Sequence, residues 1–219
     1  MDANEVAAYL KNHPEFFVQY AELLNRIHIP SPHGGRAISI TERQLGNLRD
    51  QVRQLENKLA ELIRFGEDND AVAAKVHRLS VDLHGASDRA ATCSVLYDHL
   101  SEDFAVPHVA IRLWGLGGGD SLEFAAVEAG IIAFAAGSTD PYCGPAQGQA
   151  AVAWLGEQAG HIRSVAQIPL RRLGQPAGEC IGLMLLASEE AQRFYSEMGT
   201  LYLRQIGELA AAALCRTSR

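Results

Sequence analysis

The sequence predicts an α+β protein in which N-terminal helices and one long coiled-coil helix precede an antiparallel sheet with helices on one side. Three observations support this class. A heptad repeat of apolar residues covers residues 45–62, the apolar period changes from helical to two after about residue 105, and two apolar runs near the C-terminus flank a glycine-containing turn. We divide the chain into an N-terminal helical segment (1–40), a coiled-coil stalk (41–86) and a C-terminal domain (87–219).

The N-terminal segment is predicted to hold two short helices. The first covers about residues 4–11, and the second begins with Pro14, whose missing N–H costs nothing in a first helical turn. The second helix carries a broad apolar face, made by Phe16, Phe17, Tyr20, Leu23, Leu24 and Ile27. Because two short helices cannot bury such a face alone, we expect them to pack on the long helix, on a partner chain or on another protein.

Residues 41–84 are predicted to form one long helix with a narrow apolar seam. The seam residues are spaced alternately three and four apart, as in a coiled coil: Leu45, Leu48, Val52, Leu55, Leu59 and Leu62. Ser39 and Glu42 fit a capping box at the start of the helix, and Gly85 fits a stop at its end. We expect the seam to pair with a second copy of the chain in a homodimer, with a self-packed helical hairpin as the alternative.

The heptad pattern is interrupted between residues 65 and 70. Gly66 and Asn69 occupy the next two seam positions, and the apolar repeat resumes at Val72 one residue out of phase. This predicts a joint, where the helix bends or changes partner. We expect the part of the helix from Val72 to Leu83 to enter the core of the C-terminal domain.

The C-terminal domain begins with a predicted helix at about residues 88–103. Strands are predicted where apolar residues alternate or form short runs, at residues 109–114, 122–127, 164–170 and 179–187. Further predicted elements are a short helix at 150–158, a hairpin turn at 174–178 and a closing helix at about 191–214. The Ala- and Gly-rich insert at 128–162 otherwise shows no clear period.

Composition and charge restrict the classes of function. A formal net charge of -7 argues against general nucleic-acid binding. The longest apolar run, residues 180–187, is too short to span a bilayer, and the first residues lack the basic and apolar regions of a signal peptide. Four scattered cysteines without a CxxC pair suit a reducing compartment. We therefore expect a cytoplasmic protein that contacts neither nucleic acid nor membrane directly.

The sequence contains no complete motif for catalysis or cofactor binding. The glycines at 115–119 do not make a dinucleotide motif, because Asp120 stands where the third glycine is needed. Solvated or capping roles explain the eight histidines better than a metal does, so we expect no metal and no cofactor. Cys143 is predicted to be a small buried residue, with a reactive thiol as the alternative. Arg171 and Arg172 are predicted to be solvated.

Several short motifs, spread over nearly the whole chain, together resemble one family. They are Tyr9-Leu10, His13-Pro14-Glu15-Phe16-Phe17, residues 38–44, Leu48-Arg49, Tyr142-Cys143-Gly144, residues 166–170 and residues 187–203. By these motifs the chain resembles the DUF484 family of bacterial proteins. The resemblance implies a GAF-like domain after the long helix. It implies little about activity, because the family is one of unknown function.

The implied GAF-like fold would hold a pocket between the sheet and the loops that cross it, which here are residues 128–162. The polar or amphipathic residues expected to line this pocket and bind a ligand are Arg112, Trp114, Glu123, Glu128, Ser138, Tyr142 and Gln167. Of these, Arg112 and Tyr142 are the strongest candidates for ligand contacts. A collapsed insert that leaves no pocket is the alternative.

Three classes of function follow from this interpretation. The preferred one is a non-catalytic GAF-like regulatory or sensory homodimer, which binds a small molecule and acts through an unidentified protein partner. The alternative is a structural adaptor whose GAF-like fold is empty. The remote alternative is a cysteine-based methionine sulfoxide reductase, for which the sequence shows no recognisable set of catalytic cysteines. No catalytic residue is therefore assigned.

Overall fold

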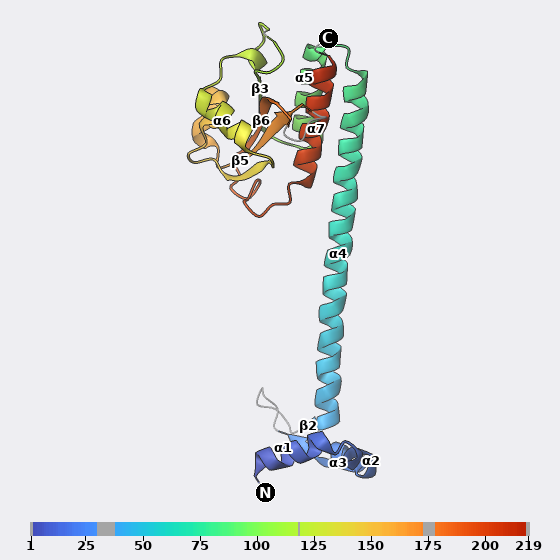
Figure 1. Cartoon of the computed structure of the whole chain (residues 1–219). Helices are drawn as coiled ribbons and strands as arrows, with labels where there is room; N and C mark the ends of the chain where they lie inside the picture. Colours follow the sequence, from blue (N-terminus) through green and yellow to red (C-terminus); the bar gives the residue numbers. More distant parts are fainter. Residues whose placement is uncertain (1, 30–37, 118, 173–177, 218–219) are drawn as a thin grey trace. The chain divides into compact units, whose positions relative to one another are not determined.

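The computed structural model describes residues 2–29, 38–117, 119–172 and 178–217 (Figure 1). The chain separates into two compact units, residues 1–67 (unit 1) and residues 68–219 (unit 2). The predicted class is confirmed, because helices and a four-stranded antiparallel sheet are combined with one very long helix. Each unit is described separately below.

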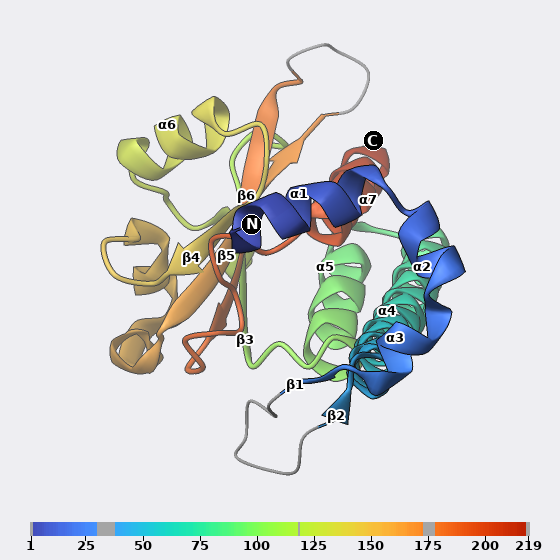
Figure 2. The same cartoon turned by 90° about the horizontal axis from the view of Figure 1, so that it is seen from below.

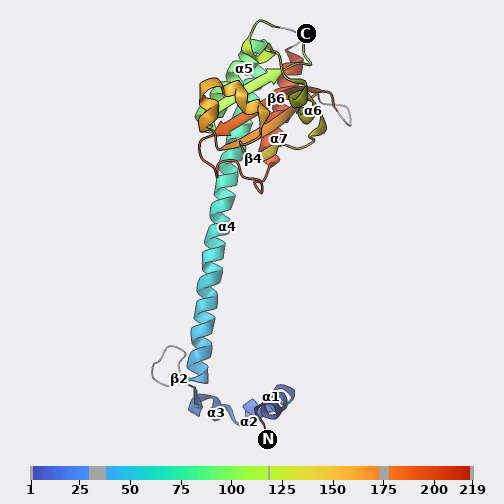
Figure 3. The same ribbon diagram turned by 90° about the vertical axis from the view of Figure 1, so that its left-hand side faces the viewer.

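Unit 1 contains short helices, a two-stranded ribbon and the first part of the long helix. Its elements are α1 (Ala3–Asn12), α2 (Glu15–Gln19), α3 (Ala21–Arg26), β1 (His28–Ile29), β2 (Ile38–Ser39) and the start of α4 (Ile40–Gly85). Asp2 and Glu5 form a capping box at α1. The predicted second helix is divided at Tyr20 into α2 and α3, which Figure 2 and Figure 3 show in succession. Of the side chains described in unit 1, none is buried.

Helix α4 is continuous over 46 residues, which corresponds to a length of about 70 Å. It begins one residue after Ser39 and ends at Gly85, as predicted. The predicted joint at residues 65–70 does not interrupt the helix, which stays α-helical through this segment. The predicted capping box lies outside the described side chains, and most of the predicted turn at 174–178 lies outside the described residues.

The centre of unit 2 is an antiparallel sheet of four strands in the order β3-β6-β5-β4. The strands are β3 (His108–Leu113), β4 (Tyr142–Pro145), β5 (Ser164–Arg171) and β6 (Cys180–Ser188). Met184 in β6 lies opposite Ile111 on one side and Ile168 on the other. The strands predicted at 109–114, 164–170 and 179–187 are thereby confirmed, whereas β4 was not predicted as a strand.

One predicted strand is wrong. Residues 122–127 contain the 3-10 turn η2 (Leu122–Phe124), in which the amide of Phe124 donates to the carbonyl of Ser121. Leu122 is 65% exposed, and β3 pairs only with β6 within the sheet. The alternating pattern therefore had no partner strand to pair with, and the chain formed a local turn instead.

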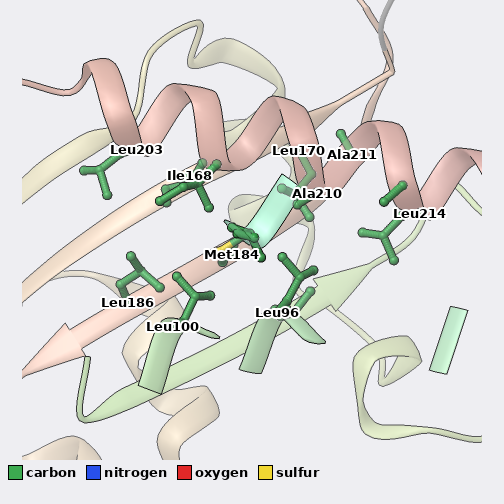
Figure 4. Close-up of a cluster of buried hydrophobic side chains, with 14 of the residues drawn as sticks. Leu96, Leu100, Ile168, Leu170, Met184, Leu186, Leu203, Ala210, Ala211 and Leu214 are labelled. Carbon is green, nitrogen blue, oxygen red and sulfur yellow. The ribbon is translucent and has the colours of Figure 1, made fainter. Parts of the chain in front are cut away.

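One group of helices lies on a single face of the sheet, as predicted, but the opposite face is covered by helical elements as well, which was not predicted. The first group consists of α5 (Arg89–Asp98), its π-helical continuation η1 (His99–Asp103), α7 (Leu201–Arg216) and the last part of α4. Figure 4 shows Leu203, Ala210 and Leu214 of α7 facing Ile168 and Leu170 of the sheet. Gly207 permits this close approach, because a Cβ there would lie 2.6 Å from Cγ2 of Ile168.

The start of the closing helix was predicted wrongly. Helix α7 begins at Leu201 and not near residue 191. The preceding segment turns inward, so that Phe194 is buried and its amide donates to the Ser164 hydroxyl at 3.3 Å. At the other end of α7, Arg216 donates to the carbonyls of Leu83 and Ala86 and thereby caps the end of α4.

The opposite face of the sheet is covered by elements from the insert that showed no clear period. Helix α6 (Ala129–Gly137) and the kinked 3-10 segment η3 (Ala150–His161) enclose a smaller apolar cluster with Val165, Leu183 and Leu185. Arg171, predicted to be solvated, donates hydrogen bonds to the carbonyls of Ala135, Ala136 and Ser138 at the end of α6. Its charge there also complements the helix dipole.

Candidate functional site

Four of the seven predicted ligand residues belong to one face of the sheet in unit 2, the face covered by α6 and η3. Arg112 and Trp114 follow Ala110 at intervals of two along and just beyond β3, and successive odd or even residues of a strand share a face. Tyr142 of β4 lies opposite Gln167 of β5, which in turn lies opposite Leu185 of β6. We use the name Arg112 cluster for Arg112, Tyr142 and Gln167, which share this face, with Trp154 beside Arg112 and Gln149 bonded to Gln167.

Arg112 is the most unusual residue of the cluster. It is only 5% exposed, although a guanidinium is costly to bury without a compensating charge. Nη1 donates to the Ile111 carbonyl at 2.9 Å, and Cζ lies 5.3 Å from the centre of the Trp154 ring. Within the described residues Arg112 forms no ion pair with a carboxylate. Its planar fork therefore retains donors that could bind an anionic group.

Glu123 lies near Arg112 but belongs to a separate hydrogen-bonded chain at the edge of β3. Partial burial acts to raise the pKa of Glu123, but hydrogen bonds from Ser121, from its own amide and from Tyr97, with the charge of Arg112, lower the pKa overall. The Tyr97 hydroxyl also accepts from the Ile111 amide at 3.3 Å. Burial, together with the negative charge of Glu123, raises the pKa of Tyr97. Tyr97 thus holds Glu123 beside the free edge of the sheet.

Gln167 and Tyr142 are both in contact with residues of the insert. Nε2 of Gln167 donates to Oε1 of Gln149 at 2.6 Å, and Gln167 is 2% exposed. The Tyr142 ring meets Phe134 edge to face at 6.3 Å between ring centres. A Cβ at position 144 would lie 2.6 Å from the Tyr142 hydroxyl, so only glycine leaves room for this ring.

Three more of the predicted ligand residues, Trp114, Glu128 and Ser138, have structural contacts. Nε1 of Trp114 donates to the Cys180 carbonyl at 2.9 Å. Glu128 and Ser138 lie at the two ends of α6, where the Glu128 carbonyl accepts from two amides of the first turn and the Ser138 hydroxyl donates to Phe134. The structure therefore places Arg112, Trp114, Tyr142 and Gln167 on one face of the sheet, spread over different strands, and it places Glu123, Glu128 and Ser138 outside this face.

The cysteines do not form a reactive set in the described part of the chain. Cys143 and Cys93 are both buried, and no disulfide joins the four described cysteines. Burial raises the pKa of each of these two thiols to about 11. Burial also raises the pKa of the Cys180 thiol, although a hydrogen bond with Gly182 acts to lower it. Because the thiolate is the nucleophile, these environments disfavour thiol catalysis.

One histidine has charged partners that the sequence did not predict. Nδ1 of His99 lies 2.6 Å from Asp103, and its Nε2 lies 2.8 Å from Asp82 on α4. Arg78 also contacts Asp103, at 3.2 Å. The two carboxylates lie on opposite sides of the ring, and no group of three potential ligands in the described chain is arranged to hold a metal ion. The contacts instead tie η1 to α4.

The predicted dimer seam is a second candidate site, in unit 1. All six of its side chains are exposed by between 49% and 66%: Leu45, Leu48, Val52, Leu55, Leu59 and Leu62. Solvated apolar side chains in a regular row on one helix mark a surface for another helix. No helix in the described residues is both long enough and apolar enough to cross a membrane.

Comparison with known proteins agrees with the resemblance found in the motifs. The family model described as "Protein of unknown function, DUF484" matches residues 1–218. The chain is also similar to proteins named "Uncharacterized protein YigA" in Salmonella typhimurium (strain LT2), Shigella flexneri and Escherichia coli (strain K12). Each is 24% identical over 214 residues, covering 94% of this chain and 88% of the relative.

Proposed function

The chain belongs to the DUF484 family, whose function is unknown, and from this premise we propose that it is a non-catalytic, cytoplasmic regulatory homodimer. In this proposal the α4 seam joins two copies, and unit 2 is a GAF-like module that binds a small anionic molecule and acts through a protein partner. The antiparallel sheet with helical layers on both faces supports the GAF-like assignment. The raised pKa values of the buried thiols support the non-catalytic one.

The observation that carries the proposal is the absence of burial in unit 1. None of its described side chains is buried, yet it contains a strict row of six apolar residues. Each such side chain is worth roughly 1.5–3 kcal/mol when fully buried, before the entropy of ordering is subtracted. Pairing of two α4 helices would bury both rows at once. A second copy is the fitting partner, because a two-fold interface needs only one self-complementary surface.

Replacing Leu55 by Asp tests the homodimer. The substitution places a charge in the centre of the seam, so we expect light scattering at micromolar concentration to show a dimer for the parent and a monomer for Leu55→Asp. Asn57→Asp is the matched control, because it adds the same charge two residues away, off the seam, and should stay dimeric. A monomeric parent, or a dimer that survives Leu55→Asp, contradicts the proposal.

The ligand part of the proposal rests on Arg112, a buried guanidinium with Trp154 stacked nearby and no ion pair among the described residues. Native mass spectrometry of the purified chain should show a bound small anion, and Arg112→Met should remove it while far-ultraviolet circular dichroism stays unchanged. Retention of the anion by Arg112→Met would assign it to another place in the molecule.

A structural adaptor with an empty fold is the second candidate, and one observation favours it. Gln167 and Gln149 bond to each other at 2.6 Å, and Tyr142 packs on Phe134, so these predicted ligand groups already have partners. Native mass spectrometry that finds only the bare polypeptide would favour the adaptor. The remote alternative, a methionine sulfoxide reductase, requires a turnover that disappears when Cys143 and Cys180 are both replaced by Ser.

A further inference from the structure

Unit 2 contains a second hollow, on the helical face of the sheet and therefore separate from the Arg112 cluster. It is a groove of about 560 Å³ between the last part of α4, the end of η1 and the start of α7. Clefts of this size hold small organic ligands. The groove includes Asn69, Val72 and Lys75 of α4, which directly follow the boundary between the units at residue 67.

The wall of the groove is mainly apolar. Leu100, Leu186 and Leu203, which Figure 4 shows at one end of the core cluster, all line it and are almost fully buried. Val72 and Met198 line it as well and are half-buried. An apolar chain placed in this groove would therefore cover the exposed parts of Val72, Phe104 and Met198 and exchange water there for hydrocarbon contacts.

Two cations stand beside one residue of this groove, Phe104. Nζ of Lys75 lies 6.0 Å from the centre of the Phe104 ring, and Nη2 of Arg193 donates to the Phe104 carbonyl at 2.6 Å. Neither forms an ion pair with any residue that the structure describes. Two neighbouring positive charges at an apolar groove, without a counter-ion from the chain, complement a ligand with an anionic head and an apolar body.

We propose that this groove binds an amphipathic organic anion, with the carboxylate of an aliphatic acid between Lys75 and Arg193 and its hydrocarbon chain along Val72, Phe104 and Met198. Such a ligand would contact α4 and α7 together, at the place where the Tyr202 hydroxyl already donates to the Asn69 carbonyl at 3.1 Å. It would favour the arrangement in which α4 is packed against α7 by its differential affinity alone. The regulatory role of this ligand rests on the proposed function, but binding of the ligand to the groove does not require the homodimer.

The test is calorimetric titration of the full chain with dodecanoate below its micellar concentration. We expect one dodecanoate per chain, and no comparable binding of dodecanol, which lacks the charge, or acetate, which lacks the chain. Lys75→Gln and Arg193→Gln should each weaken binding about tenfold, since each removes a charge-assisted contact. Arg64→Gln is the matched control, because it removes one positive charge from the same helix but does not line the groove, and it should leave binding within about twofold.

Two further variants keep the result unambiguous. Gly199 lines the groove and has open space where a Cβ would stand, so Gly199→Leu should block binding without loss of folded structure. Leu55→Asp should bind dodecanoate as the parent does, so that failure of the homodimer and failure of the groove are told apart. Equal binding of dodecanol, equal weakening by Arg64→Gln, unchanged binding in Gly199→Leu, or no binding of dodecanoate at all would each overturn the proposal.

Discussion

Helix α4 has two rows of apolar residues, one in each unit, and the side chains of the two rows differ in exposure. In unit 2 its residues Val76, Leu79 and Leu83 are at most 8% exposed, because α5, α7 and the sheet surround them. In unit 1 the row from Leu45 to Leu62 is about half exposed throughout. The two rows have nearly the same spacing in the sequence, so periodicity alone does not say whether the chain itself or another molecule covers a helix.

The two units therefore differ in the source of their stability. Unit 2 has an interior of fully enclosed side chains and can be stable by itself. Unit 1 has no enclosed side chain among those described, and isolated helices gain little from propensity alone. We therefore expect the order of unit 1 to depend on concentration and that of unit 2 not to.

Proteolysis should give the largest contrast between the units. In the Leu55→Asp variant, trypsin should cut the exposed basic sites of α4 up to Arg64 and leave a resistant fragment that begins at Phe65. In the Asn57→Asp control the same sites should be cut much more slowly, because pairing of the helices in the proposed dimer would protect them. Mass spectrometry identifies the product. Complete digestion of both variants, or a resistant fragment that contains unit 1, would contradict the expected difference in protease resistance between the units.

A pair of equivalent Leu→Ala substitutions should separate the units in thermal unfolding. Leu100→Ala empties a fully enclosed site, so we expect it to destabilise unit 2 by about 2–5 kcal/mol and leave the proposed dimer intact. Leu48→Ala, at a position that is 56% exposed, should lower the midpoint temperature of only one transition, the one that depends on protein concentration. Circular dichroism at two concentrations checks both. One common transition, shifted alike by both variants, would mean that the units unfold together.

Alkaline pH should have the smallest effect, and only on unit 2. The pKa of Cys143 is raised by burial from 9.0 to about 11, as is that of Cys93, so the folded state keeps these protons when the unfolded state has lost them. Their contribution to stability is thus fully present below pH 9 and is lost as the pH rises from 9 to 11. Urea unfolding at pH 8 and pH 10.5 should show a smaller loss for Cys143→Ala than for the parent. An equal loss would leave the thiol without a role in the pH dependence.

Much of the fold could be predicted because its signals are local. The apolar run of β6, the alternation in β3 and β5 and the seam of α4 are each patterns of residues close together in the sequence. The false strand at 122–127 has the same alternation around Leu122 and Phe124, but a strand needs a partner, and partners come from distant segments. The late start of α7 has a similar cause, because Phe194 is drawn to Ser164, 30 residues away in the chain.

The candidate sites, too, were predicted where the signal is local and missed where it comes from distant segments. Arg112 and Gln167 were proposed as ligand residues on predicted strands, whereas Tyr142 was placed in the crossing loops and lies instead in the strand β4. Their contacts Gln149 and Trp154 were missed, since the insert has no clear period from which a face could be assigned. The groove was missed altogether, because its lining comes from α4, η1, β6 and α7 and from the segment around Arg193, and no single stretch of sequence contains it.

The cap that Arg216 places on α4 has a consequence for the order in which the protein forms during translation. The carbonyl of Leu83 is synthesised 133 residues before the guanidinium that binds it. Residues 1–67 are therefore long outside the ribosome before unit 2 can close, and domains generally fold in the order of their synthesis. On a polysome, two nascent chains could join through Leu45 to Leu62 while their C-terminal halves are still being made, so that each dimer would consist of neighbours on one messenger RNA.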